Sequence, residues 1–142
     1  MKSIYILVFA ALLPLAAEAQ DFAPQPADQV VLADQLYVKR PIVVFADSPN
    51  DPNYIRQMEL LARAYPDLAE RDVILVTDTD PAAKTEWRQK LRPNGFSLVI
   101  MDKDLQPVVR KPLPWDVREI THAIDKLPLR ITEILEQNPA GR

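Results

Sequence analysis

Short runs of apolar residues alternate with amphipathic segments along this chain of 142 residues. The runs at residues 42–46, 73–76 and 96–101 contain no polar alternation, which predicts strands that are buried on both faces. A fourth run, at residues 107–110, follows the third after a short polar turn, and this spacing predicts an antiparallel hairpin.

The segments between these runs have the period of helices. Asp51 followed by Pro52 predicts an N-cap and a first helical residue, because proline lacks only an N–H that would be unpaired there. The Asp-Pro pair recurs at residues 80–81 and predicts a second helix through residue 91. Pro66 should end or kink the first helix. The apolar positions expected to face the core are Ile55, Met58, Leu61, Ala62 and Tyr65 in the first helix, and Ala83, Trp87 and Leu91 in the second.

The last helix is predicted after Pro114, where Asp116 and Glu119 have the spacing of a capping box. Its core positions are Val117, Ile120, Ile124 and Leu127. Pro128 interrupts the pattern, which resumes at residues 131–137. His122 falls opposite the apolar positions and should face solvent.

The predicted element order is therefore β-α-β-α-β-β-α. Two right-handed βαβ crossovers, a hairpin and a final helix predict an α/β fold with a mixed sheet of about four strands, covered on both faces. This order is that of a thioredoxin-like three-layer sandwich.

The first 19 residues predict a signal peptide. Lys2 precedes an apolar run at residues 4–17, and the small residues Ala17 and Ala19 predict cleavage between Ala19 and Gln20. Retention as an N-terminal anchor is the alternative. We expect a flexible lead-in at residues 20–31, one domain at residues 32–135, a frayed tail at residues 136–142, and a periplasmic or secreted location.

Composition narrows the chemistry. The chain has no cysteine, which excludes disulfides, thiol–disulfide exchange and thiol peroxidase activity. With a single histidine, His122, a zinc, copper or iron–sulfur site is not expected, and we predict no cofactor. The net charge of −3, from interspersed acidic and basic residues, argues against a nucleic-acid surface. No segment after the signal peptide has the composition of a membrane span.

The loop that follows the first strand is one candidate ligand site. A thioredoxin-like fold places its redox cysteines here, and this chain has Asp47, Ser48 and Asn50 instead. The amino end of the following helix, with Ser48 and Asn50 beside it, could bind an anion. The alternative is that these residues, with Asp51, only cap the helix and form a turn.

A second candidate is Asp78-Thr79-Asp80, which directly follows the second strand. Haloacid-dehalogenase-type phosphohydrolases place a nucleophilic carboxylate and a general acid in this way, beside magnesium. Ala82 departs from that motif, and Pro81 makes Asp80 resemble an ordinary N-cap. With Asp47, these carboxylates could instead form a weak calcium or magnesium site at the carboxyl edge of the sheet, or act as separate caps.

Two further groups are weaker candidates. Ser48 lacks the sequence of a nucleophile elbow, and nothing connects it to His122. Arg110, Lys111 and Arg130 could form a basic cluster if the hairpin and the last helix are neighbours, although arginines near helix ends commonly serve carbonyl groups instead.

Three segments resemble a known family: KRPIVVFADSPNDPNY at residues 39–54, AERDVILV at residues 69–76, and FSLVIMDKDLQPVVR with AIDKLPLR at residues 96–110 and 123–130. This combination resembles domain of unknown function 4174, a family of small exported bacterial proteins with related modules in animal extracellular sushi-repeat proteins. The resemblance covers residues 32–135 and is most specific at Ile124-Asp125-x-x-Pro128-x-Arg130. Leu127, Leu129 and Leu105 depart from the residues usual in the family. The resemblance implies a thioredoxin-like, peroxiredoxin-related domain and supplies no catalytic residues.

The leading hypothesis is thus an exported binding or interaction module that recognises an unknown protein or a small anionic ligand. Its candidate ligand-binding residues are Asp47, Ser48, Asn50, Asp78 and Asp80. The alternative is a metal-dependent hydrolase that uses the carboxylates at the strand ends. A purely structural protein of the cell envelope is a third hypothesis.

Overall fold

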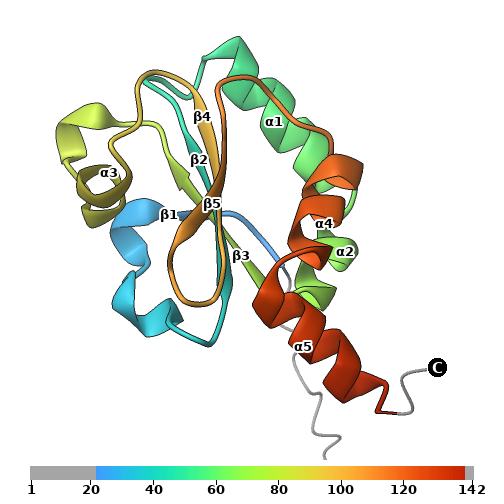
Figure 1. Ribbon diagram of the computed structural model, residues 1–142. Helices are drawn as coiled ribbons and strands as arrows, with labels where there is room; N and C mark the ends of the chain where they lie inside the picture. The colour runs from blue at the N-terminus through green and yellow to red at the C-terminus, as the bar shows by residue number, and fades with distance from the viewer. Residues whose placement is uncertain (1–21, 140–142) are drawn as a thin grey trace, which may run out of the picture.

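A computed structural model describes residues 22–139 of the chain, and these residues form an α/β fold (Figure 1). The strands are β1 (Gln25–Pro26), β2 (Arg40–Phe45), β3 (Val73–Asp78), β4 (Ser97–Met101) and β5 (Pro107–Lys111). The α-helices are α1 (Pro52–Ala62), α2 (Tyr65–Glu70), α3 (Glu86–Leu91), α4 (Val117–Asp125) and α5 (Pro128–Gln137). Three short 3₁₀ helices are η1 (Ala27–Gln29), η2 (Ala33–Gln35) and η3 (Pro81–Ala83).

The sheet has the strand order β1-β3-β2-β4-β5. Strands β1 and β2 are parallel to β3, whereas β4 is antiparallel to both β2 and β5. The mixed sheet is therefore confirmed, and a strand lies at each of the four predicted positions, with the β4–β5 hairpin, but the sheet has five strands and not the predicted four. The additional strand, β1, lies in the predicted lead-in at residues 20–31. It has only two residues and no apolar pattern, so periodicity gives no signal for it.

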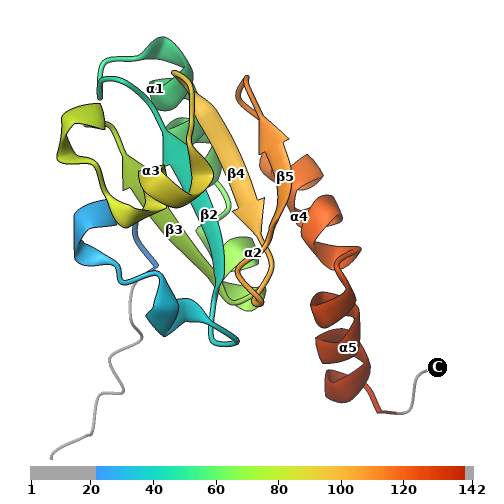
Figure 2. The same ribbon diagram turned by 60° about the vertical axis from the view of Figure 1, so that its left-hand side comes forward.

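Helices cover both faces of the sheet, as Figures 1 and 2 show: α1, α2 and α4 lie on one face, and α3 and η1 lie on the other. Successive residues of the central strand β2 serve the two faces in turn, because side chains alternate along a strand. All six β2 residues are buried. Ile42 and Val44 pack beneath α1, α2 and α4, and Val43 and Phe45 pack with Trp87 and Leu91 of α3.

The predicted helix starts at Asp51 and Asp116 are confirmed. The Asp51 carboxylate accepts a hydrogen bond from the Asn53 N–H at 2.8 Å, and Asp116 caps α4 in the same way. The helix predicted at residues 80–91 is instead divided into η3 and α3. Lys84, at φ +47°, ends the first turn in the left-handed region, and the Thr85 side chain caps the second.

The predicted core face of α1 is partly wrong. Leu61 is buried, but Ile55 is 45% exposed and Ala62 is also exposed, whereas the polar residue Gln57 is completely buried. The Gln57 amide is satisfied by the backbone of Trp115: its Nε2 donates to Trp115 O at 2.9 Å, and its Oε1 accepts from Trp115 N at 2.8 Å. An apolar-period argument cannot detect a buried amide of this kind.

Two other predictions concern exposure and the membrane. His122 is exposed on α4, as predicted. Within residues 22–139, no helix combines the length and the apolar character needed to cross a bilayer. The signal peptide predicted at residues 1–19 lies outside the described residues.

Candidate functional site

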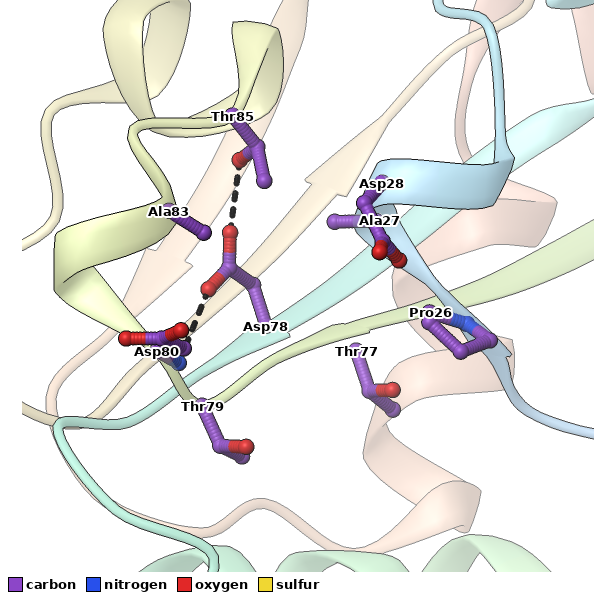
Figure 3. A pocket seen from close by; sticks show the side chains of 9 residues that line it. All are labelled: Pro26, Ala27, Asp28, Thr77, Asp78, Thr79, Asp80, Ala83 and Thr85. Atoms are coloured by element: carbon purple, nitrogen blue, oxygen red, sulfur yellow. Dashed lines mark hydrogen bonds between the residues drawn. The ribbon is translucent and has the colours of Figure 1, made fainter.

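The carboxyl ends of the parallel strands border a cavity of about 240 Å³ (Figure 3). It lies where β3 runs into η3, opposite η1. Of the five predicted site residues, Asp78 and Asp80 line this cavity, and Asp47, Ser48 and Asn50 do not. The other lining residues are Pro26, Ala27, Asp28, Thr77, Thr79, Ala83 and Thr85.

The Asp78 carboxylate is buried, with the residue only 5% exposed, and its oxygen atoms are occupied by donors from the protein itself. Thr85 Oγ1 donates to Oδ2 at 2.6 Å, and Arg88 Nε donates to Oδ1 at 2.7 Å. The Asp80 N–H also donates to Oδ1, at 3.2 Å. Figure 3 shows the bonds from Thr85 and Asp80. Since both oxygen atoms of the carboxylate already accept hydrogen bonds within the protein, these contacts favour a structural role.

Arg88 closes the carboxyl edge of the sheet between β2 and β3. Its Nη2 atom donates to Ala46 O at 2.7 Å and to Asp78 O at 3.1 Å, and its guanidinium lies 5.4 Å from the centroid of the Phe45 ring. The Ala46 carbonyl lies one residue beyond the last paired residue of β2, where it would otherwise need water, whereas the Asp78 carbonyl also accepts from Ala46 N at 2.9 Å. The Asp78–Arg88 pair thus fastens α3 to the sheet.

The remaining predicted residues have local partners. Asp80 caps η3 by accepting from Ala82 N at 3.1 Å, and Ser48 Oγ accepts from Asn50 N at 3.1 Å. Asp47 is exposed. Within residues 22–139, no three histidine, cysteine or acidic side chains lie close enough together to hold a metal ion. The cavity is therefore lined by the hydroxyl groups of Thr77 and Thr79 and by the exposed carboxylates of Asp28 and Asp80. Such a lining is suited to hydrogen bonding with a small polar molecule.

A second cavity, of about 440 Å³, lies between α1 and α4, and no sequence pattern predicted it. Three arginines line it: Arg56 and Arg63 from α1 and its carboxyl end, and Arg118 from the first turn of α4. The other lining residues are Leu60, Ala64, Asp67, Asp116, Val117 and Thr121. Because Arg118 is far from Arg56 and Arg63 in the sequence, its position beside them depends on the packing of α4 beside α1.

The opposite edge of the sheet, at the amino ends of β2 and β3, holds a network of eight charged side chains. We call it the ion network. Its centre is Arg40, which is completely buried. Arg40 Nε donates to Asp102 at 2.9 Å, Nη2 donates to Glu133 at 2.9 Å, and Nη1 donates to the Arg71 carbonyl at 2.7 Å. The other members are Arg71, Asp72, Asp102, Lys103, Asp125, Arg130 and Glu133.

The ion network connects α5 to the rest of the domain. Glu133 accepts from Arg40 and lies 2.6 Å from Lys103 Nζ, while Asp125 accepts from Arg71 at 2.9 and 3.0 Å. Hydrogen bonds from Arg71 lower the pKa of Asp125, outweighing the effect of burial. Burial raises the pKa of Glu133, but the hydrogen bonds from Arg40 and Lys103 outweigh it and leave the pKa below its usual value.

The possible basic cluster of Arg110, Lys111 and Arg130 does not form, and Arg110 instead serves a helix-end carbonyl, which was the alternative. Arg110 donates to the Leu91 carbonyl, Lys111 lies over the Trp115 ring, and Arg130 pairs with Asp125. Each cation thus has a different partner. Adjacent residues of β5 point to opposite faces of the sheet, which separates Arg110 from Lys111.

Comparison with known proteins places these features in a family but not in a functional class. No curated protein matches the chain. The model of the family described as Domain of unknown function (DUF4174) matches residues 31–133, which is most of the chain and nearly the range that the motifs indicated. The resemblance noted in the sequence is therefore confirmed, and the chain belongs to the DUF4174 family.

Proposed function

We propose that this protein is an exported thioredoxin-like domain that works without thiol chemistry, as a binding or interaction module. The element order from β2 to α4 and the mixed sheet covered on both faces support the thioredoxin-like assignment. The absence of cysteine from the whole sequence excludes disulfide exchange and thiol peroxidation. Export follows from the signal peptide predicted at residues 1–19.

The observation that carries this proposal is the state of Asp78. In open α/β sheets, ligands and catalytic groups gather at the carboxyl ends of the strands. Both oxygen atoms of the buried carboxylate at that edge accept hydrogen bonds within the protein, from Thr85, Arg88 and the backbone of Asp80. A catalytic carboxylate needs a free lone pair directed at substrate, or a metal ion beside it. The internal bonds favour recognition over catalysis.

The test is a substrate screen with the mature chain starting at Gln20. Phosphatase, esterase and peptidase substrates are assayed with and without millimolar magnesium or calcium, beside the variants Asp47→Ala and Asp78→Asn. We expect no turnover that either variant abolishes, and no heat of magnesium or calcium binding by calorimetry. Turnover that requires Asp47 or Asp78 would refute the proposal in favour of the metal-dependent hydrolase.

Export has its own test. The full-length chain is expressed in a bacterium and the recovered protein is analysed by intact mass. We expect a periplasmic or secreted product that begins at Gln20. A product that keeps residues 1–19 and sediments with membranes would instead identify an anchored protein.

A further inference from the structure

Most arginines of the domain donate side-chain hydrogen bonds within the protein, but those around the α1–α4 cavity do not. Residues 22–139 contain nine arginines, of which five donate side-chain hydrogen bonds: Arg40, Arg71, Arg88, Arg110 and Arg130. Among the described contacts, Arg56, Arg63, Arg92 and Arg118 donate none. Three of these four line the same cavity. Arg56 forms an exposed ion pair with Glu59, with 3.7 Å between Nη1 and Oε2, and an exposed pair of this kind is weak.

The rest of the lining is apolar at its base and acidic at one side. Val117 is buried and Leu60 is half-buried, so the base offers carbon surface to a ligand. Two carboxylates also line the cavity: that of Asp67, and that of Asp116, which caps α4 by accepting from Arg118 N. Three arginines and two aspartates give the lining a net charge of +1, while the whole chain carries −3. An anion would be attracted by this surface and not by the protein as a whole.

The spacing of the arginines indicates the shape of that anion. Arg56 and Arg63 are seven residues apart on one helix, a rise of about 10 Å at 1.5 Å per residue. In an extended peptide of the polyproline II type, which has three residues per turn, acidic residues three positions apart lie on the same side and are separated by about 9 Å, at roughly 3.1 Å per residue. Guanidinium groups bind carboxylates in a bidentate geometry. The third guanidinium, that of Arg118, belongs to α4 on the other side of the cavity. The volume, about 440 Å³, lies in the range of ligand sites.

We infer that the α1–α4 cavity binds an extended acidic peptide segment of a partner protein. Arg56 and Arg63 pair with successive acidic side chains, Arg118 holds the segment from the other side, and apolar residues between the acids contact Leu60 and Val117. This inference rests on the proposed role as a binding module and names the chemistry of its partner. It assigns no role to the cavity at Asp78.

The test is fluorescence anisotropy with a fluorescein-labelled peptide, Glu-Ala-Val-Glu-Ala-Val-Glu, and its counterpart with glutamine at each glutamate. We expect saturable binding of the acidic peptide by the mature chain, weakened by added salt, and no binding of the glutamine peptide. Combining Arg63→Gln with Arg118→Gln should weaken binding by about tenfold or more. The matched control is Arg92→Gln, another arginine without a described partner, which should bind as the wild type does.

Several results would overturn the inference. They are equal binding of the glutamine peptide, an equal loss in Arg92→Gln, an unchanged affinity in the double variant, or no saturation at about 1 mM protein. Complete displacement by millimolar inorganic phosphate would also overturn it, because the cavity would then hold a single oxyanion. The substituted side chains are exposed, so urea midpoints should be unchanged. A negative peptide result leaves the substrate screen, and with it the proposed function, unaffected.

Discussion

Replacing Arg40 with methionine tests whether the ion network contributes to the free energy of unfolding of the domain. Methionine keeps the length and apolar stem of the side chain but removes every donor of the guanidinium. Arg40 is 0% exposed, and its partners Asp102 and Glu133 have side chains that are 6% and 19% exposed. The substitution therefore leaves two carboxylates and the Arg71 carbonyl with one partner fewer in a largely dry environment.

The expected cost follows from that burial. Breaking a buried ion pair by removing one partner destabilises a protein by about 3–5 kcal/mol, because the remaining charge is uncompensated. We expect the lower end, about 3 kcal/mol, since Lys103 still pairs with Glu133 and the Lys103 N–H still donates to Asp102. The free energy of unfolding of a native domain is about 5–15 kcal/mol, so a loss of about 3 kcal/mol is a large share of it.

The assay is urea unfolding followed by the fluorescence of the buried Trp87. With an m-value of about 1.5 kcal/mol/M, the midpoint should fall by about 2 M. The matched control, Arg92→Met, removes an exposed arginine and should change the free energy of unfolding by less than about 0.5 kcal/mol. Should Arg40→Met fail to fold, Asp102→Asn still weakens the pair and keeps a measurable transition.

Two outcomes would refute the reasoning about Arg40. One is a loss below about 1 kcal/mol, which is the value of an exposed pair. The other is strict additivity of Arg40→Met and Asp102→Asn. Once the guanidinium is gone, removing its partner's charge should cost less, so a true pair gives a double variant that is more stable than the sum of the single losses predicts.

Two further predictions concern α5 and α1. The folded pKa of Glu133 lies below its ordinary value of 4.5, so its contribution to stability is complete above that pH and is lost as the pH falls through the folded pKa. The measurement is urea unfolding at pH 7 and pH 3, where the difference in the free energy of unfolding between wild type and Glu133→Gln should become smaller in acid. The control, the exposed Glu136→Gln, should differ little from wild type at either pH. A difference for Glu133→Gln that does not change with pH would contradict this. Gln57→Leu leaves both backbone groups of Trp115 unpaired and should cost about 1–3 kcal/mol by the same assay. The exposed Gln89→Leu should cost less than about 0.5 kcal/mol, and equal losses for the two glutamine variants would show that the buried amide is not the cause.

The sequence predicted the parts of the fold that local chemistry determines. Strands β2, β3 and β4 are buried on both faces, so each is a nearly continuous apolar run. Asp51 and Asp116 cap their helices through contacts two residues away, a range that a sequence pattern can reveal. In contrast, β1 exists because Gln25 and Pro26 lie alongside Val76 and Thr77, and only the tertiary structure brings these segments together.

The candidate sites were harder to predict, for the same reason. Asp78 and Asp80 were placed correctly at the carboxyl edge, because strand ends are visible in the sequence. The hydrogen-bond donors to the Asp78 carboxylate were not predictable, since one of them, Arg88, belongs to the next helix along the chain. The α1–α4 cavity was missed entirely. Its arginines look like ordinary surface charges until α1 and α4 pack side by side.

Most residues of the ion network lie in the three sequence segments that resemble the family. The three motif segments contain Arg40, Arg71, Asp72, Asp102, Lys103, Asp125 and Arg130, which are all members of the network except Glu133. The arginines of the α1–α4 cavity, Arg56, Arg63 and Arg118, lie outside every motif. The segments that resemble the family therefore hold most of the charged contacts between the sheet, α4 and α5, and none of the arginines of the α1–α4 cavity. On this argument, a relative that keeps the network but lacks the three arginines should fold as this domain does and fail to bind the acidic peptide.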